Sequence, residues 1–260
     1  MTEFTPQDTT IEVKPYKDHT KSASMMKVML WFGLGLLITG VIALTVPDLM
    51  LFAVDKFGWT ANTVSTIYTV FLVISIILMI PSSLLVTFKS MRPRSGWMTA
   101  GYITYCVSMG FLLSNVFLTI SAFTTALNVS FIRTVSVAFL ATAGCFLLMG
   151  LFSMLFKKDL GILMPFLFTL ITGAMILSLV NFFMQVDMIF WIVDFVLFGV
   201  LLLTAAIDIQ RVRKIAAAGA LDSSNNLAIY CAYTLYADFV VLFLRILYYV
   251  VIVFANNRNN

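Results

Sequence analysis

Seven apolar stretches, separated by short polar connections, dominate the chain between residues 28 and 254. Each has 19 residues or more, and a helix of about 20 residues crosses the roughly 30 Å hydrocarbon core of a bilayer. Strands of a membrane β-barrel are about 10 residues of alternating polarity, so these continuous runs favour helices. We therefore predict seven transmembrane helices, at Val28–Val46, Val64–Phe88, Trp97–Leu118, Thr134–Phe156, Leu160–Phe183, Met188–Ile209 and Leu227–Phe254.

The composition agrees with an all-α membrane protein. Of 260 residues, 61% are apolar and 11% are charged, whereas soluble domains carry about 25% charged residues. A secreted disulfide scaffold, a nucleic-acid-binding domain and a disordered chain are excluded on this ground. We predict a disordered N-terminal tail over residues 1–23 and a seven-helix transmembrane domain over residues 24–260. The segment 119–133, which is apolar but rich in Ser and Thr, is predicted to be a short outer connection.

The basic residues predict how the helices are oriented, because cytoplasmic loops are enriched in Lys and Arg. With the N-terminus inside, the cytoplasmic segments hold 12 of the 16 Lys and Arg residues, and the outer segments hold Lys56, Arg133 and Arg258. Arg245 is the remaining one and lies inside the last helix. The sequence thus predicts a multi-pass protein of the cell membrane, most simply a bacterial plasma membrane, with a cytoplasmic N-terminus and an outer C-terminus. Its basic loops face anionic lipid, and no nucleic-acid partner is needed.

Residues that are missing from the spans exclude several activities. The only histidine is His19, in the tail, so the membrane contains no histidine to bind zinc or to activate a serine. No lysine lies within a predicted span, which excludes a retinal Schiff base. We predict a protein that is not an enzyme and that has no resident metal or cofactor.

Four ionisable groups lie inside predicted helices: Asp194 and Asp208 on the sixth, and Asp238 and Arg245 on the seventh. A charge in the bilayer costs about 2.5–3.5 kcal/mol on insertion scales, so these groups are expected to face one another or water. At 100° per residue, the two aspartates of the sixth helix are about 40° apart, and Asp238 and Arg245 are about 20° apart. Each helix therefore has one polar stripe.

The axial positions leave two pairings open. The sixth and seventh helices are antiparallel, and if Asp208 meets Asp238, then Arg245 stops about 10 Å short of Asp194. Helical side chains also lean toward the N-terminus, which points Arg245 toward Asp238. An Asp194–Arg245 bridge and an Asp208–Asp238 pair are thus competing predictions.

Packing alone could explain some of these charges. Asp194 and Arg245 could satisfy each other or the backbone, and Asp208, beside Arg211 at a helix end, could be interfacial. Asp238 differs because it lies within an otherwise apolar run, where a buried acid is a functional candidate.

Several motifs around these residues resemble the Bax inhibitor-1 family of transmembrane Bax-inhibitor-motif proteins. YTLYADF, from Tyr233 to Phe239, is similar to the last-helix motif of that family, and AIDIQRVRKI, from Ala206 to Ile215, is similar to its Asp-x-Gln-x-Ile/Val segment. GYITYCVSMGFLLS, from Gly101 to Ser114, resembles its third helix. The segment Lys157–Phe183 resembles its fourth loop and fifth helix.

The resemblance implies a fold in which the last helix is central among the other six. Bacterial members are described as pH-sensitive calcium leak proteins in which two aspartates share a proton and an arginine that ends the second helix contacts them. Residue by residue, the aspartates correspond to Asp208 and Asp238, and the arginine to Arg92. The resemblance therefore favours the Asp208–Asp238 pair over the Asp194–Arg245 bridge.

The sequence departs from the family pattern at three places. MIPSS, around Pro81, replaces a segment that carries an acid in some members, and Ile207 replaces the aromatic residue that often precedes the first aspartate. Near Tyr248 the usual terminal arginine is absent, and Arg245 stands one turn earlier. These changes keep the aspartate pair but alter the field around Asp238.

Three functions follow as hypotheses. The first is a calcium leak channel with a pH-sensing pair, Asp208 and Asp238, and a gating partner, Arg92; lipid and transiently bound calcium are its partners. The second is a membrane regulator that does not conduct and that modulates a membrane protease or a stress response through protein partners. The third, a proton-coupled transporter of small solutes, has no evident substrate pocket in the sequence.

Overall fold

The computed structural model describes residues 18–58, 60–88, 95–126, 130–156, 158–218, 221 and 225–259. Over these residues seven helices are long and apolar enough to cross a membrane, which confirms the predicted fold class. A short 3-10 helix precedes the fifth. The elements are α1 (Asp18–Phe57), α2 (Ala61–Thr87), α3 (Ser95–Ala126), α4 (Phe131–Leu155), η2 (Leu160–Leu163), α5 (Met164–Met184), α6 (Asp187–Ala217) and α8 (Asn225–Asn259).

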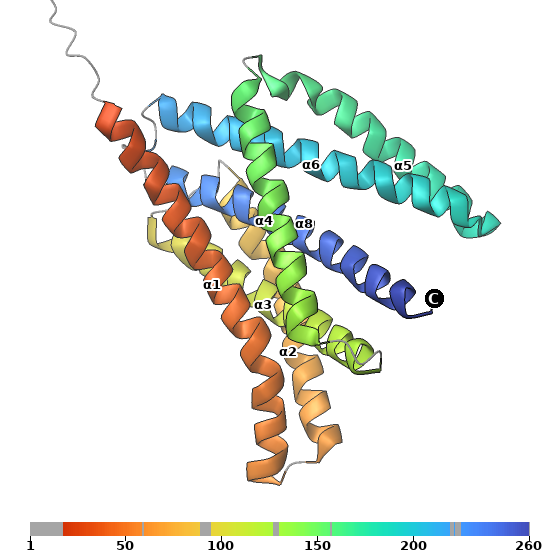
Figure 1. Ribbon diagram of the computed structural model, residues 1–260. Helices are drawn as coiled ribbons and strands as arrows, with labels where there is room; N and C mark the ends of the chain where they lie inside the picture. Colours follow the sequence, from red (N-terminus) through yellow and green to blue (C-terminus); the bar gives the residue numbers. More distant parts are fainter. Residues whose placement is uncertain are drawn as a thin grey trace, which may run out of the picture.

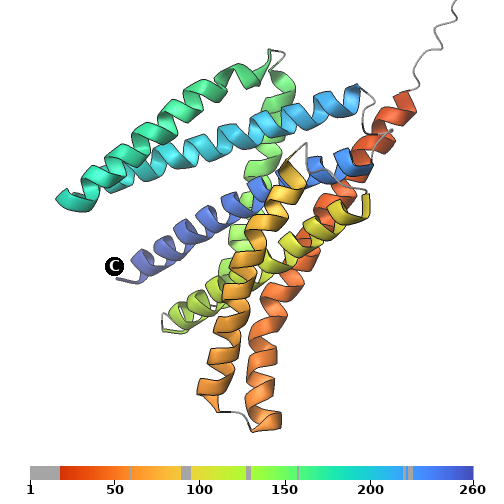
Figure 2. The same cartoon turned by 180° about the vertical axis from the view of Figure 1, so that it is seen from behind.

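The last helix, α8, runs through the middle of the bundle (Figures 1 and 2). It packs against α1, α3, α4 and α6, and more lightly against α2. The position of α5 differs from the predicted ring of six, since over the described residues it packs chiefly on α6 and η2. Both views show α5 and α6 side by side, extending away from the rest of the bundle.

The surface of α5 explains why the hairpin formed by α5 and α6 can extend away from the other helices. Only Leu167 and Ala174 of α5 are buried, while large apolar side chains such as Phe168, Met175 and Phe182 are exposed. A helix that is apolar all round requires either a core or a membrane. Because α5 is covered on one side only, lipid is the solvent for the rest.

The segment 119–133 was predicted to be a connection, but α3 continues to Ala126. The hydroxyl groups of Thr119 and Thr125 donate to backbone carbonyls one turn earlier in the same helix. A hydroxyl that is satisfied in this way adds little polarity to the helix surface. The Ser and Thr content therefore did not mark the end of the helix.

The first helix is also longer than predicted, because it begins at Asp18. Residues 18–23, which were assigned to the tail, belong to α1. Residues 1–17, the remainder of the predicted tail, lie outside the described residues.

Aromatic residues fix α8 against α1 and α3. The hydroxyl of Tyr102, on α3, donates to the carbonyl oxygen of Trp31, on α1, at 2.9 Å. The hydroxyl of Tyr236, on α8, is hydrogen-bonded to that of Thr39, on α1. The ring of Tyr102 reaches α1 because Gly35 has no side chain, since a Cβ there would lie 2.1 Å from the Tyr102 hydroxyl. The hydrogen bond between Tyr236 and Thr39 in turn fixes α8 against α1, two residues from Asp238.

Candidate functional site

Asp208 of α6 and Asp238 of α8 face each other across the contact between these helices. Asp208 is buried and Asp238 is half-buried, and their carboxyl groups are near enough for the charge of one to act on the other. One carboxyl oxygen of Asp238, Oδ2, is buried and has no hydrogen-bond partner among the described residues. Two carboxylates offer only acceptors to each other, so a proton is needed to make a hydrogen bond between them.

A cation on α6 lies beside this pair. The Nη1 of Arg211 donates to Oδ1 of Asp208 at 3.2 Å, from three residues further along the helix. Its charge also acts on Asp238. The side chain of Arg211 is 47% exposed, so solvent or lipid head groups reach it. The sequence analysis placed Arg211 beside Asp208 at the end of the helix, and the i, i+3 spacing is the signal for this contact.

The predicted gating partner, Arg92, lies outside the described residues, within the gap 89–94. Its place relative to Asp208 and Asp238 therefore stays a prediction. Arg211 is the arginine that the described structure brings to the pair.

Gln210 holds the connection between α4 and η2 against α6. Its side-chain amide nitrogen donates to the carbonyl oxygens of Phe156 and Lys158, and its Oε1 accepts from the backbone nitrogen of Leu160 at 2.8 Å. Two residues apart on a helix, Asp208 and Gln210 point about 200° apart. Within the Asp-x-Gln segment, Asp208 thus lies toward α8, and Gln210 binds the connection between α4 and η2. The family resemblance included Gln210, but its role was missed.

An exposed ion pair adds to the same connection. The Nζ of Lys214 lies 2.8 Å from Oδ1 of Asp159, which also accepts from the backbone nitrogen of Gly161. The hydrogen bond from Lys214 lowers the pKa of the Asp159 carboxyl below its ordinary value of 3.8. The C-terminal end of α6 is therefore tied to the segment that leads into α5.

A second charged cluster lies further along the same two helices. Asp194, on α6, is buried and forms an ion pair with the guanidinium of Arg245, on α8. The hydroxyl of Tyr249 donates to the other carboxyl oxygen of Asp194. Tyr249 was not among the predicted site residues, because a tyrosine near the end of a membrane helix usually marks the interface.

Of the two pairings that the sequence set against each other, the Asp194–Arg245 bridge is present, whereas the Asp208–Asp238 pair stays a prediction for two carboxyl groups that lie near each other. The straight-helix calculation left Arg245 about 10 Å short of Asp194, and a long arginine side chain can span much of such a gap. The lean of helical side chains is a weak preference, since a poor rotamer costs about 0.5–1.5 kcal/mol, whereas an unpaired charge in the bilayer costs about 2.5–3.5 kcal/mol. The ion pair therefore decides which way Arg245 extends.

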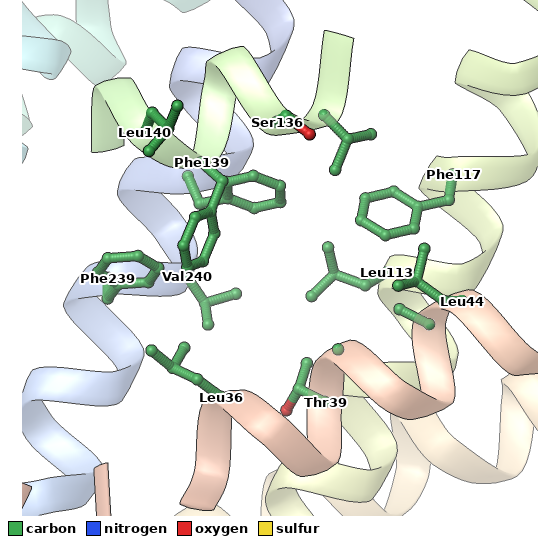
Figure 3. Close-up of a pocket in the computed structure, with 14 residues that line it drawn as sticks. Leu36, Thr39, Leu44, Leu113, Phe117, Ser136, Phe139, Leu140, Phe239 and Val240 are labelled. Carbon is green, nitrogen blue, oxygen red and sulfur yellow. The ribbon is translucent and has the colours of Figure 1, made fainter. Parts of the chain in front are cut away.

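An apolar cavity of about 490 Å³ lies between α1, α3, α4 and α8. Figure 3 shows the side chains of Leu36, Phe117, Phe139 and Phe239 around it, with the Thr39 hydroxyl at one edge. The lining carries no charged group. Within the described ranges, no three His, Cys, Asp or Glu residues lie close enough together to hold a metal ion.

Seven apolar helices, with Asp194, Asp238 and Arg245 at the contact between α6 and α8, define a multi-pass integral membrane protein. Residues 21–259 match the protein family described as "Inhibitor of apoptosis-promoting Bax1", and the chain belongs to this Bax inhibitor family. The inner membrane protein YbhL of Escherichia coli strain K12 is 26% identical over 239 residues, which cover 90% of this chain and 92% of YbhL. YbhL of Escherichia coli O6:H1, strain CFT073, matches to the same extent.

Proposed function

We propose that the chain is a pH-sensitive calcium leak protein of the bacterial cell membrane, neither an enzyme nor a carrier of a resident cofactor. The proximity of the Asp208 and Asp238 carboxyl groups, where α6 packs on α8, is the observation that carries this proposal. The choice of calcium as the conducted ion rests on the resemblance to family members that leak calcium.

The proton shared by the two carboxyl groups is the switch. While the proton is present, a hydrogen bond joins α6 to α8. Without it, two carboxylates about 4 Å apart repel each other by about 4 kcal/mol at an effective dielectric constant near 20. Such a pair also offers the oxygen ligands that calcium accepts. Arg211 favours the ionised state, and we assign the same role to Arg92.

Calcium flux into proteoliposomes over a series of pH values tests the proposal. We expect the wild-type flux to depend on pH, and Asp208→Asn and Asp238→Asn each to flatten that dependence, because an amide cannot gain or lose the proton. Asp48→Asn, which changes an exposed aspartate of α1, is the matched control and is expected to keep the wild-type profile. Identical pH profiles in the wild type and both site variants would contradict the proposal.

The orientation follows the basic residues, with the N-terminus in the cytoplasm and the C-terminus outside. A cysteine substituted at Asn257 is then expected to react with a membrane-impermeant maleimide added to intact spheroplasts. Labelling only after the membrane is opened would reverse the assignment.

A regulator that does not conduct is the second candidate, and one observation favours it. Lys158, Arg211 and Lys214 are exposed together at the inner end of α6, which is a basic surface suited to an acidic partner protein. On this view the aspartate pair only locks the helices. Deleting residues 1–17, which precede α1, separates the two candidates. A conducting core keeps its calcium flux, whereas a regulator shows no flux in either form.

A further inference from the structure

A polar cavity lies beside the Asp194–Arg245 ion pair, between α5, α6 and α8. Its volume is about 410 Å³. Its polar lining comes from all three helices and includes Ser178, Asn181, Asp194, Arg245 and Tyr248. This cavity is separate from the Asp208–Asp238 pair, and the calcium proposal makes no use of it.

The carboxylate and amide oxygens of this cavity, which can only accept hydrogen bonds, are already engaged. One carboxyl oxygen of Asp194 pairs with Arg245 and the other accepts from Tyr249. The Oδ1 of Asn181 accepts from the backbone nitrogen of Val186 at 2.9 Å, where it caps the turn between α5 and α6.

The donors, in contrast, are open. The Nε of Arg245 is buried and has no acceptor among the described residues. Over the same part of the chain, the side-chain nitrogen of Asn181 and the hydroxyl groups of Ser178 and Tyr248 also make no hydrogen bond to protein. Polar groups without partners are costly in a membrane. The complement of this lining is therefore a molecule rich in acceptor oxygens.

An apolar cavity of about 470 Å³ adjoins the polar one and shares Leu197, Arg245 and Tyr248 with it. Its remaining lining is entirely aliphatic, from Ile171, Val200, Leu201, Val241 and Leu244. Val241 lies one turn from Arg245 in the direction of Asp238, so this cavity leads toward the middle of the membrane. A ligand that fills both cavities has an oxygen-rich part and a hydrocarbon part.

The depth of the polar cavity matches the interface of the bilayer. Asp194 is seven residues into α6, which places it about 10 Å from the end of that helix. Trp191 precedes Asp194 by about one turn of α6, Tyr248 lines the same cavity and Tyr249 binds Asp194. Trp and Tyr gather at membrane interfaces. Phe182 and Phe190, which also line the cavity, are exposed on the outside of the bundle, so the cavity is reached from the lipid.

We propose that these two cavities together bind one phospholipid molecule. The phosphate and ester oxygens accept from Arg245, Asn181 and Tyr248, and one acyl chain occupies the aliphatic cavity. The aliphatic cavity favours a lipid over a free anion, which would leave it unfilled. The bound lipid joins α5 to α8, two helices that make little direct contact over the described residues. This proposal does not rest on the calcium function.

Native mass spectrometry of the full-length protein in mild detergent, titrated with dioleoyl phosphatidylglycerol, tests the site. The variant Asn181→Asp/Tyr248→Phe removes two donors, keeps the acceptor that caps Val186, and leaves the ion pair intact. We expect its affinity to fall about thirtyfold, because two hydrogen bonds are lost and each contributes on the order of 1 kcal/mol. Asn62→Asp, on an exposed residue in the first turn of α2, is the matched control and is expected to bind as the wild type does.

Two further measurements, on a cavity-filling variant and on competing ligands, identify the ligand. Val241→Trp fills the aliphatic cavity from a half-exposed position and is expected to weaken lipid binding without touching the ion pair. Inorganic phosphate and dioleoylglycerol, each carrying only half of the ligand, are expected to compete poorly with the phospholipid. Wild-type affinity in the double variant or in Val241→Trp overturns the proposal. Competition by phosphate alone as strong as that by the lipid also overturns it, because the site would then bind a soluble anion.

Discussion

Removal of Arg245 is expected to destabilise the α6–α8 contact strongly. The side chain of Asp194 is only 6% exposed, and that of Arg245 is 28% exposed. In Arg245→Met the hydroxyl of Tyr249 is the one side-chain donor that remains for Asp194 among the described residues. Breaking a buried ion pair by removing one partner costs about 3–5 kcal/mol. Because Arg245 is partly exposed, we expect the low end of this range, about 3 kcal/mol.

The assay is reversible unfolding in mixed micelles, with the double variant Asp194→Asn/Arg245→Met completing a thermodynamic cycle. The double variant is expected to be more stable than Arg245→Met alone, because it leaves no unpaired charge in the membrane. Arg133→Met, which removes an exposed arginine of α4, is the control, with an expected change within about 0.5 kcal/mol. The reasoning is refuted if Arg245→Met loses less than about 1 kcal/mol, or if the effects of the two substitutions simply add.

Two further substitutions test contacts that hold the site in place. Gly35→Ala is expected to cost about 1–3 kcal/mol of stability through overpacking against the hydroxyl of Tyr102. Gly33→Ala is the control and is expected to be neutral or slightly stabilising, because nothing lies within 4 Å of the new methyl group. Thermal unfolding of both variants checks this, and equal midpoints would contradict it. Asp159→Asn is expected to lower the thermal midpoint at neutral pH, because the hydrogen bond from Lys214 holds the pKa of Asp159 below 3.8 and this stabilisation is present above that pH. It is lost as the pH falls through the lowered pKa, so the difference between variant and wild type is expected to vanish there, and a constant difference across the acid range would argue against the ion pair.

The candidate site was predictable as a set of residues but not as a set of contacts. Asp208 and Asp238 could be singled out because charges are scarce within apolar helices. The neighbours Arg211, Gln210 and Tyr249 could not be selected in the same way, since arginine, glutamine and tyrosine near helix ends are common and each has a simple interfacial explanation. Their partners lie on other helices or on a loop, except for Arg211, whose spacing from Asp208 was informative.

The sequence by itself determined the seven spans and the short list of intramembrane charges, because the thickness of the bilayer and the cost of burying charge act on each helix separately. The tertiary structure decided how the helices meet. It showed that α5 packs on α6 away from α8, and that Arg245 pairs with Asp194 while Asp208 and Asp238 lie near each other on the same two helices. Such contacts depend on how helices cross and on how far side chains reach, and residue spacing along one helix fixes neither. The open donors beside Arg245 are likewise a property of three helices, and only their assembly reveals them.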